Sequence, residues 1–511
     1  MNSLFFKTLL VFFIALWLVF PLYGQIDISL TQGNSVAMDR TAKYKGILGA
    51  DDDLFYVLKI KTLGKGTKYY VEAYNKNNFA QKFSVNLELD GIDGAETDPA
   101  HFQVNSYAMN GKVYVFFGAY YGKEKEKMLL SISVDKNGVL SKEKEIMRTF
   151  VEDPETSFFH LSLSPDRKKV ALINEIRLRK APQHVSVLIC DANTLEPLNN
   201  FTLPKEYGRG GIYSGNYVID NSGNFYFSFN YLTSSDKVGL ALGSIPFKSK
   251  GMKAIELNLS SQKEMHNGVL KINSFDNTIS INGMFKDEVI KEKKPKQLVE
   301  RKVGIFTYKI DMEKFAIISS FETYLSKEVY ISLSYMNIVT PFLPGDKLYT
   351  ADDILFTENA SYFIASVSYT VKSNTTYNVS DEIIVTKINP EGKIEWMKTI
   401  PKSTSDKAIS YNSVVFNDDV YFLFLEHPKN AKFDYKEYVG GTYEPIRKLD
   451  GANVVCYSLS KSGQLNKTFL YENKDFSFYP HSQNFFLDKN NGLLMHFVKG
   501  GSEKFGKVTI K

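Results

Sequence analysis

The hydrophobic positions of this chain fall into short runs rich in β-branched and aromatic residues, separated by clusters of Asn, Asp, Gly and Pro. Such runs are typical of β-strands, whereas a sustained 3.6-residue apolar period is hard to find beyond residue 20. Eight runs stand out, at 54–60, 112–121, 169–176, 224–232, 278–285, 361–371, 420–426 and 492–498. The pattern therefore predicts an all-β protein.

A turn cluster precedes each run at a nearly constant spacing. The clusters lie at 52, 110, 166, 222, 276, 359, 418 and 491, and five of the seven steps between them fall within 54–59 residues. Asn, Asp and Gly supply the positive φ and local hydrogen bonds that tight hairpins need. A second series of turns follows the first by about 24–28 residues in the first four units. Each unit is therefore expected to hold four antiparallel strands, A to D, joined by an A–B turn, a B–C loop and a C–D turn.

A four-stranded antiparallel unit repeated along a chain predicts a β-propeller. We expect one propeller domain over residues 25–511, with eight blades and seven as the alternative. The eighth unit reaches Lys511 after only three strands, while residues 26–30 alternate apolar and polar side chains. The N- and C-terminal strands are therefore predicted to pair and close the ring, which removes an exposed sheet edge.

One stretch carries a family resemblance. LSLSPDRKKVALINE (161–175), followed by VSVLICDANTLEP (185–197), resembles the Ser-Pro-Asp blade motif of TolB-like and WD-repeat-like bacterial propellers. The resemblance spans one blade of eight. It implies the propeller architecture and carries over no active site.

The first residues have the features of a secretory signal peptide. Lys7 precedes the apolar run Leu9–Phe20, and Gly24 stands where a signal peptidase would cut. An uncleaved anchor is the alternative, but the run is short beside the ~20 residues of a spanning helix. We expect residues 1–24 to be removed, and the mature protein to be periplasmic, on the outer surface or secreted.

Composition narrows the choice of partners. Lys and Arg number 62 against 57 Asp and Glu, and a net charge of +5 is too slight to imply a nucleic-acid partner.

Two cysteines exclude a disulfide scaffold. Cys190 and Cys456 fall in strand C of blades 3 and 7, too far apart for the ~7 Å limit of a disulfide, and are predicted to be buried thiols.

No local catalytic motif appears in the sequence. The carboxylate clusters at 51–53, 352–353 and 417–419 lack the spacing of a calcium loop and are interpreted as solvated turn residues. We expect neither a metal nor another cofactor.

A His or Tyr lies 6–10 residues before every A–B turn, where strand A would begin at the channel mouth. This set could bind a ligand, and its histidines a metal ion; packing repeated from blade to blade is the alternative. The members are Tyr44, His101, His160, Tyr213, His266, Tyr349, Tyr411 and His481.

Two B–C connections are longer than the rest. The one in blade 5 spans 286–302 and offers Lys286, Lys291 and Lys293 as a basic flank. The blade 7 insert, Pro428–Leu449, adds three candidate ligand-binding side chains, Tyr435, Tyr438 and Tyr443. Elaborated loops on a rigid scaffold often carry function; solvated hairpins are the alternative.

Two classes of function remain. The first is a monomeric, non-catalytic module that binds a protein or glycan on this loop face. The second is an exported hydrolase or lyase acting on glycans, with its site at the channel mouth. Paired carboxylates at a defined separation would indicate the enzyme.

Overall fold

The computed structural model describes most of the predicted propeller. The described residues are 28–39, 41–63, 66–87, 89, 103–177, 184–204, 213–232, 238–249, 251–260, 263–287, 302–335, 348–372, 376–405, 411–433, 443–446, 452–472, 479–480, 486–488 and 492–511. The predicted signal peptide, 1–24, lies outside this range.

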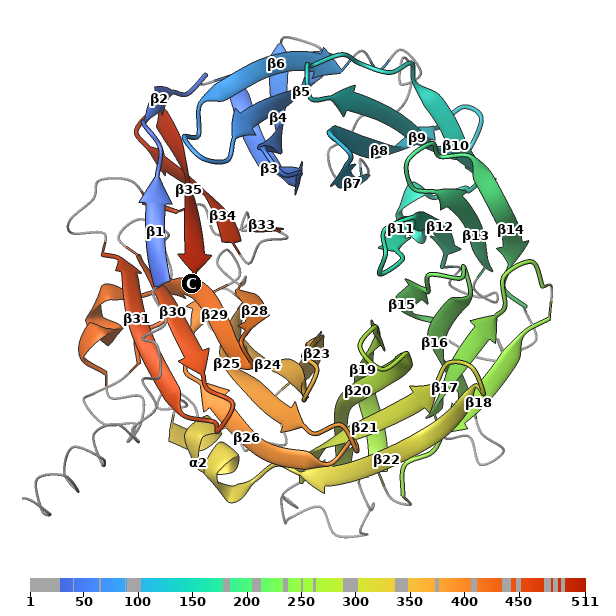
Figure 1. The fold of residues 1–511 in the computed structure, drawn as a ribbon, viewed down its shortest axis with the longest axis vertical. Coiled ribbons are helices and arrows are strands. Elements are labelled where there is room, and N and C mark those ends of the chain that lie inside the picture. The colour runs from blue at the N-terminus through green and yellow to red at the C-terminus, as the bar shows by residue number, and fades with distance from the viewer. Residues whose placement is uncertain are drawn as a thin grey trace, which may run out of the picture.

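Eight antiparallel sheets form a ring of blades around a central channel (Figure 1). Six sheets have four strands, and the blade 6 and blade 8 sheets carry short additional strands. The eight-bladed prediction is confirmed, and the seven-bladed alternative is wrong. One strand of each blade lies beside the channel and another forms the perimeter (Figure 1).

The first four blades are regular. Their strands are β3 (Ala42–Ala50), β4 (Leu54–Leu63), β5 (Gly66–Asn75) and β6 (Gln81–Leu87) in blade 1; β7 (Gln103–Met109), β8 (Lys112–Tyr121), β9 (Glu126–Asp135) and β10 (Lys144–Phe150) in blade 2; β11 (Ser157–Leu163), β12 (Lys169–Ile176), β13 (His184–Asp191) and β14 (Pro197–Thr202) in blade 3; and β15 (Tyr213–Ile219), β16 (Phe225–Leu232), β17 (Val238–Ile245) and β18 (Lys253–Leu257) in blade 4.

The later blades carry additions. Their strands are β19 (Lys263–Asn273), β20 (Thr278–Asp287), β21 (Val303–Asp311) and β22 (Ala316–Tyr324) in blade 5; β23 (Leu348–Phe356), β24 (Ser361–Lys372), β25 (Thr376–Ile388), β26 (Ile394–Ile400) and β27 (Thr404–Ser405) in blade 6; β28 (Asn412–Phe416), β29 (Asp419–Glu426), β30 (Asn453–Leu459) and β31 (Leu465–Tyr471) in blade 7; and β32 (Tyr479–Pro480), β33 (Phe486–Asp488), β34 (Gly492–Lys499), β35 (Ser502–Ile510), β1 (Ile28–Gln32) and β2 (Val36–Ala37) in blade 8.

The helical elements are short. Helix α2 (Lys327–Tyr335) lies outside the ring against β26, and two 3-10 turns are η2 (Pro154–Thr156) and η5 (Pro428–Lys432) (Figure 1). None of the helices in the described ranges has the length and hydropathy of a bilayer-spanning segment.

The turn chemistry places the strands where the pattern predicts them. Strands β8 and β12 begin and end at the predicted residues, 112–121 and 169–176. Asn110, Gly223 and Asn277 take positive φ values of 51°, 96° and 57° in A–B turns. Asn and Gly adopt positive φ at low cost, so each turn cluster fixes the position of one A–B hairpin along the chain.

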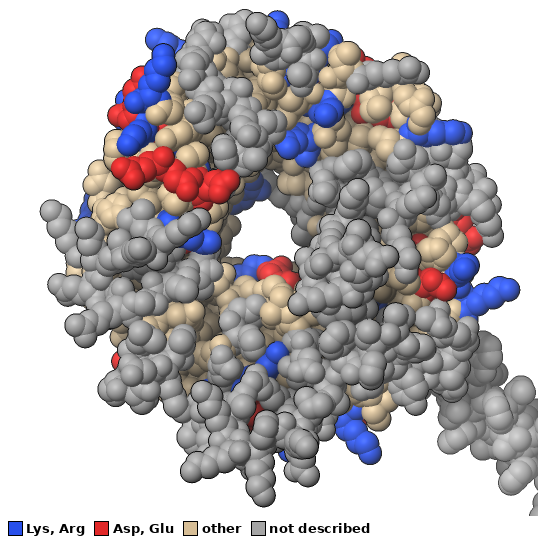
Figure 2. Space-filling view, turned by 180° about the vertical axis from the view of Figure 1, so that it is seen from behind, with Lys and Arg blue, Asp and Glu red and all other residues tan. Residues whose placement is uncertain are grey.

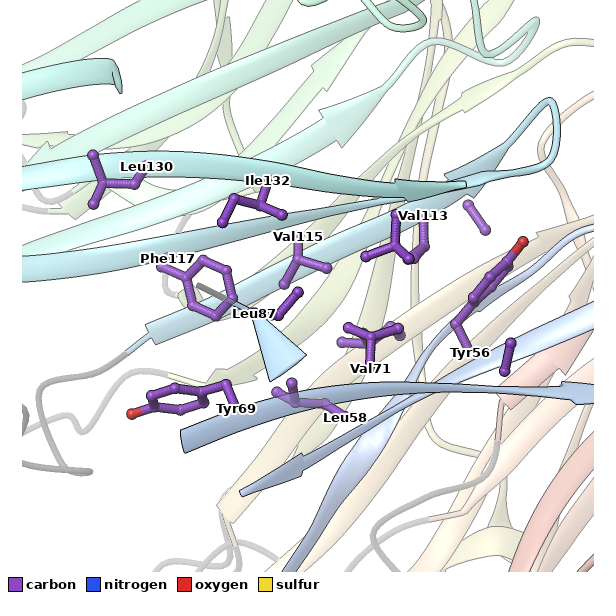
Figure 3. Close-up of a cluster of buried hydrophobic side chains, with 14 of the residues drawn as sticks. Tyr56, Leu58, Tyr69, Val71, Leu87, Val113, Val115, Phe117, Leu130 and Ile132 are labelled. Atoms are coloured by element: carbon purple, nitrogen blue, oxygen red, sulfur yellow. The ribbon is translucent and has the colours of Figure 1, made fainter. Parts of the chain in front are cut away.

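The blades are held together by apolar packing. Strand β8 is buried along nearly its whole length, because one face packs on blade 1 and the other on blade 3. Between blades 1 and 2, side chains such as Tyr56, Val71, Val115 and Phe117 interdigitate (Figure 3). Each blade has two apolar faces and depends on both neighbours.

The ring closes through the predicted pairing of the two termini. Strand β1 pairs antiparallel with β35, from Ile28 opposite Ile510 to Gln32 opposite Gly506. Ile28 and Leu30 pack on the apolar cluster between blades 7 and 8. The N-terminal strand is therefore the outermost strand of the last blade.

Both cysteines are buried and free, as predicted. Cys190 lies in β13 and Cys456 in β30. Burial raises the pKa of the Cys190 thiol to about 11 and that of Cys456 to about 12. Neither thiol is activated for reaction.

A charge on the inner face of β1 should weaken the whole ring. We expect Leu30→Asp to destabilise the domain by at least about 2 kcal/mol, since it places a carboxylate against an apolar cluster. Thr31→Asp is the matched control, because Thr31 is exposed on the same strand. Urea unfolding followed by tryptophan fluorescence should show one transition, shifted only for Leu30→Asp; equal shifts for both variants would contradict the closure role of β1.

Candidate functional site

The channel wall is built from the innermost strand of each blade. Successive side chains of a strand point to opposite faces of its sheet, so neighbouring residues reach the two neighbouring blades. In β7, Asn105 Nδ2 donates to the carbonyl of Phe159 in blade 3 at 3.2 Å. The next residue, Ser106, donates to the carbonyl of Leu48 in blade 1 at 2.6 Å.

The same alternation links the later blades. Asp353 in β23 pairs with Lys271 of blade 5, with 2.7 Å between Nζ and Oδ1. Asp352, one residue earlier, accepts hydrogen bonds from Tyr411 of blade 7 and from Ser366. Both carboxylates therefore lie in strand A of blade 6 and have partners, so they are strand residues and not turn residues.

The innermost strands of blades 1, 4, 5 and 6 contain bulges or irregular pairing. The pairing register shifts between Met265 and Asn267 in β19, and between Ala351 and Asp353 in β23. The extra residues are His266 and Asp352. Bulges re-aim side chains and are common beside functional sites.

Asp352 lies in the innermost strand of blade 6, where it is exposed yet partly desolvated by the protein around its carboxyl group. The loss of solvation raises the pKa of this carboxyl group, and the negative charge of Asp353 adds to the effect. Hydrogen bonds from Tyr411 and Ser366 and the charge of Lys402 oppose the rise without cancelling it. Figure 2 shows the central opening, with charged side chains of both signs at its rim.

The buried carboxylate of Glu175 organises the channel wall of blade 3. Arg177 Nε donates to Oε1 at 2.6 Å, His160 Nε2 lies 3.1 Å from Oε2, and the hydroxyl of Tyr217 donates to Oε2 at 3.1 Å. Burial alone would raise the pKa of Glu175, but hydrogen bonds from His160 and Arg177 and the positive charge of Arg177 outweigh it, so the pKa is lowered. Glu175 is therefore an ionised acceptor at neutral pH.

Arg177 and His160, which both hydrogen-bond to Glu175, remain accessible. The side chains of Arg177 and His160 are 49% and 31% exposed, whereas that of Glu175 is fully buried. The Arg177 guanidinium stacks on Phe158, 4.8 Å from the ring centre. Since an ionised carboxylate only accepts hydrogen bonds, His160 Nε2 carries the proton and Nδ1 is left as an acceptor in the neutral ring.

A second charged cluster lies at the interface of blades 8 and 1, and it is closed to solvent. Lys59 Nζ lies 2.7 Å from Glu72 and 2.5 Å from Glu503, and His496 Nε2 lies 2.9 Å from the other Glu503 oxygen. The Tyr44 ring stacks on His496 with 3.9 Å between centres. Tyr44 therefore packs against a neighbouring blade, which was the alternative to ligand binding for the His and Tyr residues at the start of strand A.

Tyr443 anchors the blade 7 insert, which corrects its assignment as an exposed contact. It is 7% exposed, and its hydroxyl lies 2.8 Å from Glu426 Oε1 and 3.1 Å from the carbonyl of Pro401. Lys467 neutralises Glu426 at 2.6 Å. Tyr443 therefore supplies one of the donors that the buried carboxylate at the end of β29 needs.

Lys286 is also misassigned by the sequence prediction. It is 6% exposed and its ammonium group lies 5.5 Å from the ring centre of buried Tyr349, so it is not part of a basic flank. Of the other predicted residues, His101, His481, Tyr435, Tyr438, Lys291 and Lys293 lie outside the described residues, as do the side chains of Tyr213 and His266.

The opposite face carries a polar hollow of about 440 Å³ between blades 1 and 2. Asp51 there accepts hydrogen bonds from the backbone of Asp53 and Leu54, so its predicted turn role is confirmed. Within the part of the chain that the structure describes, no three His, Cys, Asp or Glu side chains are placed to hold a metal ion.

Known proteins resemble the chain in fold only. It matches no protein-family model, and no curated protein is detectably similar in sequence. Among solved structures, the Dos1 propeller is 10% identical with a TM-score of 0.46, covering 93% of this chain and 94% of that chain. Polysaccharide lyase Uly1 is 10% identical with a TM-score of 0.38, covering 80% and 89%.

The β-propeller domain of the Trilobed protease from Pyrococcus furiosus is a third such structure. It is 12% identical with a TM-score of 0.35, covering 86% of this chain and 98% of that domain. No activity is transferred from similarities of this size.

Acidification should loosen the interface of blades 8 and 1 through His496. Burial lowers the pKa of His496 below its usual 6.5, against the opposing effect of Glu503. The unfolded chain therefore takes up this proton first, and folding stability falls as the pH drops below about 6.5. Glu503, whose pKa is lowered from 4.5, adds its loss only at more acidic pH.

Urea midpoints at pH 7.5 and 5.5 should test this prediction. We expect wild type to lose more stability over the interval than His496→Gln, which keeps a donor toward Glu503 and does not titrate. Equal losses in the two proteins would contradict it.

Removing one hydroxyl should weaken the anchor of the blade 7 insert. We expect Tyr443→Phe to destabilise the domain by about 1–2 kcal/mol, because Glu426 loses a buried donor. Tyr421→Phe is the matched control: Tyr421 is buried in the same blade, and its hydroxyl has no partner among the described residues. Equal unfolding midpoints for the two variants would refute the anchoring role.

Proposed function

We propose that this protein is an exported, non-catalytic propeller that binds a protein or glycan ligand at the channel mouth, on the face of the D–A and B–C connections. The observation that carries the proposal is the accessible Arg177–His160 pair, held in place by buried Glu175. Donors fixed before a ligand arrives lose little entropy on binding.

The carboxylates of this site are better suited to holding binding residues in place than to acid–base catalysis. A general acid must hold a proton near neutral pH, whereas the lowered pKa of Glu175 keeps it ionised. Asp353 is paired with Lys271. These carboxylates serve as structural partners of cations and leave the donors to face the ligand.

Export is part of the proposal. The apolar run Leu9–Phe20 and the cleavage position at Gly24–Gln25 support it, and the first described strand begins soon afterwards at Ile28. Mass spectrometry of the secreted or periplasmic protein should find Gln25 as the first residue.

A glycan-active hydrolase or lyase is the second candidate, and the raised pKa of Asp352 favours it. A carboxyl group with a raised pKa is better suited to general acid catalysis than one with an ordinary pKa. Turnover of a polysaccharide that Asp352→Asn abolishes would support the enzyme over the binding module.

The binding face can be tested by blocking one face at a time. The native thiols are buried, so a cysteine introduced at the surface can be coupled selectively to a polyethylene glycol maleimide. Glu152, 79% exposed in the connection from β10 to β11, lies on the proposed face. Lys136, exposed in the C–D turn of the same blade, lies on the opposite face and is the matched control.

The two labelled proteins should be applied to a glycan array and to purified envelope proteins. We expect Glu152→Cys to lose binding when it is coupled, and Lys136→Cys to retain it. The reverse result would move the site to the opposite face.

A further inference from the structure

The geometry points to a carboxylate subsite at Arg177 and His160, and we propose that its ligand is an acidic glycan bound through a uronate sugar. This inference rests on the proposed function and deepens it, because it names the class of ligand and the residues that recognise it. The subsite lies on blade 3, where it borders blade 4, at accessible side chains of β11 and of the residue that follows β12.

Strand pairing places the recognition residues on one face of blade 3. Phe158 in β11 stands opposite Glu175 in β12. His160 lies two residues from Phe158, and Arg177 lies two residues from Glu175. Since side chains two apart along a strand share a face, these four side chains converge. The hydrogen bond from Tyr217 of blade 4 to Glu175 shows that this face of blade 3 borders blade 4.

Arg177 is prepared for bidentate recognition. Its Nε atom is occupied by Glu175 at 2.6 Å, and the plane of the guanidinium is fixed by stacking on Phe158. The described residues provide no partner for its two terminal nitrogens. Two parallel N–H groups match the two oxygens of a carboxylate, which is the strongest use of this side chain.

His160 adds a requirement for a hydroxyl group. With Nε2 donating to Glu175, the neutral ring offers Nδ1 as an acceptor. A carboxylate has no hydrogen to give to that atom, whereas a sugar hydroxyl has. A ligand with hydroxyls beside a carboxylate, as in a uronate, satisfies both Arg177 and His160.

The adjoining wall also suits a hydroxyl-bearing ligand. Asn105 gives one amide hydrogen to the carbonyl of Phe159, next to His160, and an amide has a second donor and an acceptor available for a ligand. An acidic peptide would satisfy Arg177 through a side-chain carboxylate, and it is the competing ligand that the titration below compares with the sugar.

The subsite can be tested by calorimetric titration of residues 25–511 with trigalacturonate, a neutral galactose trisaccharide and triglutamate. We expect trigalacturonate to bind most tightly and to weaken as salt is added. Arg177→Gln should lower its affinity at least about tenfold, as the loss of a charged hydrogen-bonding pair implies. His160→Gln should weaken it less, and should leave triglutamate unaffected.

Two further variants make the test specific. Arg177→Lys keeps the charge near Glu175 but lacks the planar fork, so it should fold and still lose affinity. Arg148→Gln, an exposed arginine of blade 2, is the matched control and should bind as wild type does. Thermal unfolding of every variant verifies the fold.

The outcomes separate this inference from the proposed function. Unchanged trigalacturonate affinity in Arg177→Lys, or tighter binding of triglutamate than of trigalacturonate, would overturn the uronate subsite. If only neutral glycans bind, and labelled Glu152→Cys blocks them, the binding face stands and the subsite fails. If coupling at Lys136 alone blocks trigalacturonate, both proposals fail.

Discussion

An isolated blade has no core, and this constraint governs the whole molecule. Strands such as β8 are apolar on both faces and are buried only because blades stand on either side. A linear stack of such blades would leave two apolar faces in water. Closing the ring removes both, and five residue pairs between β1 and β35 complete the last blade. The stability of every blade therefore depends on contact between the two ends of the chain.

The ring also determines what the channel wall can present. Innermost strands use consecutive side chains to reach both neighbours, as Asn105 and Ser106 do, so many polar groups of the wall are committed to structure. Groups that remain accessible are those held by a buried partner. Arg177 and His160 are accessible because Glu175, beneath them, provides their common contact.

The sequence predicted the strands and turns better than the site, for a physical reason. Turns such as Asn110-Gly111 are local: positive φ is a property of the residues themselves. The pairing of β1 with β35 was also predictable, because the sequence showed that the last blade lacks its fourth strand and that residues 26–30 can supply one. Contacts between blades were not, because they join residues such as Asp352 and Tyr411 that are distant in sequence. Glu175 and Arg177, charged residues at the end of an apolar strand, were the signal that was missed. Tyr443 was assigned to the surface because its partner, Glu426, could not be known.

The pairing of β1 with β35 also has a consequence for the order of events in the cell. The ribosome makes β1 first and its partner strand last, and Lys59 must wait for Glu503, 444 residues later. Contacts this distant form late and slow folding. Until synthesis ends, the first strand has an unpaired edge that can pair with other chains. Such a protein would benefit from a chaperone that shields its leading strand until the last one has emerged.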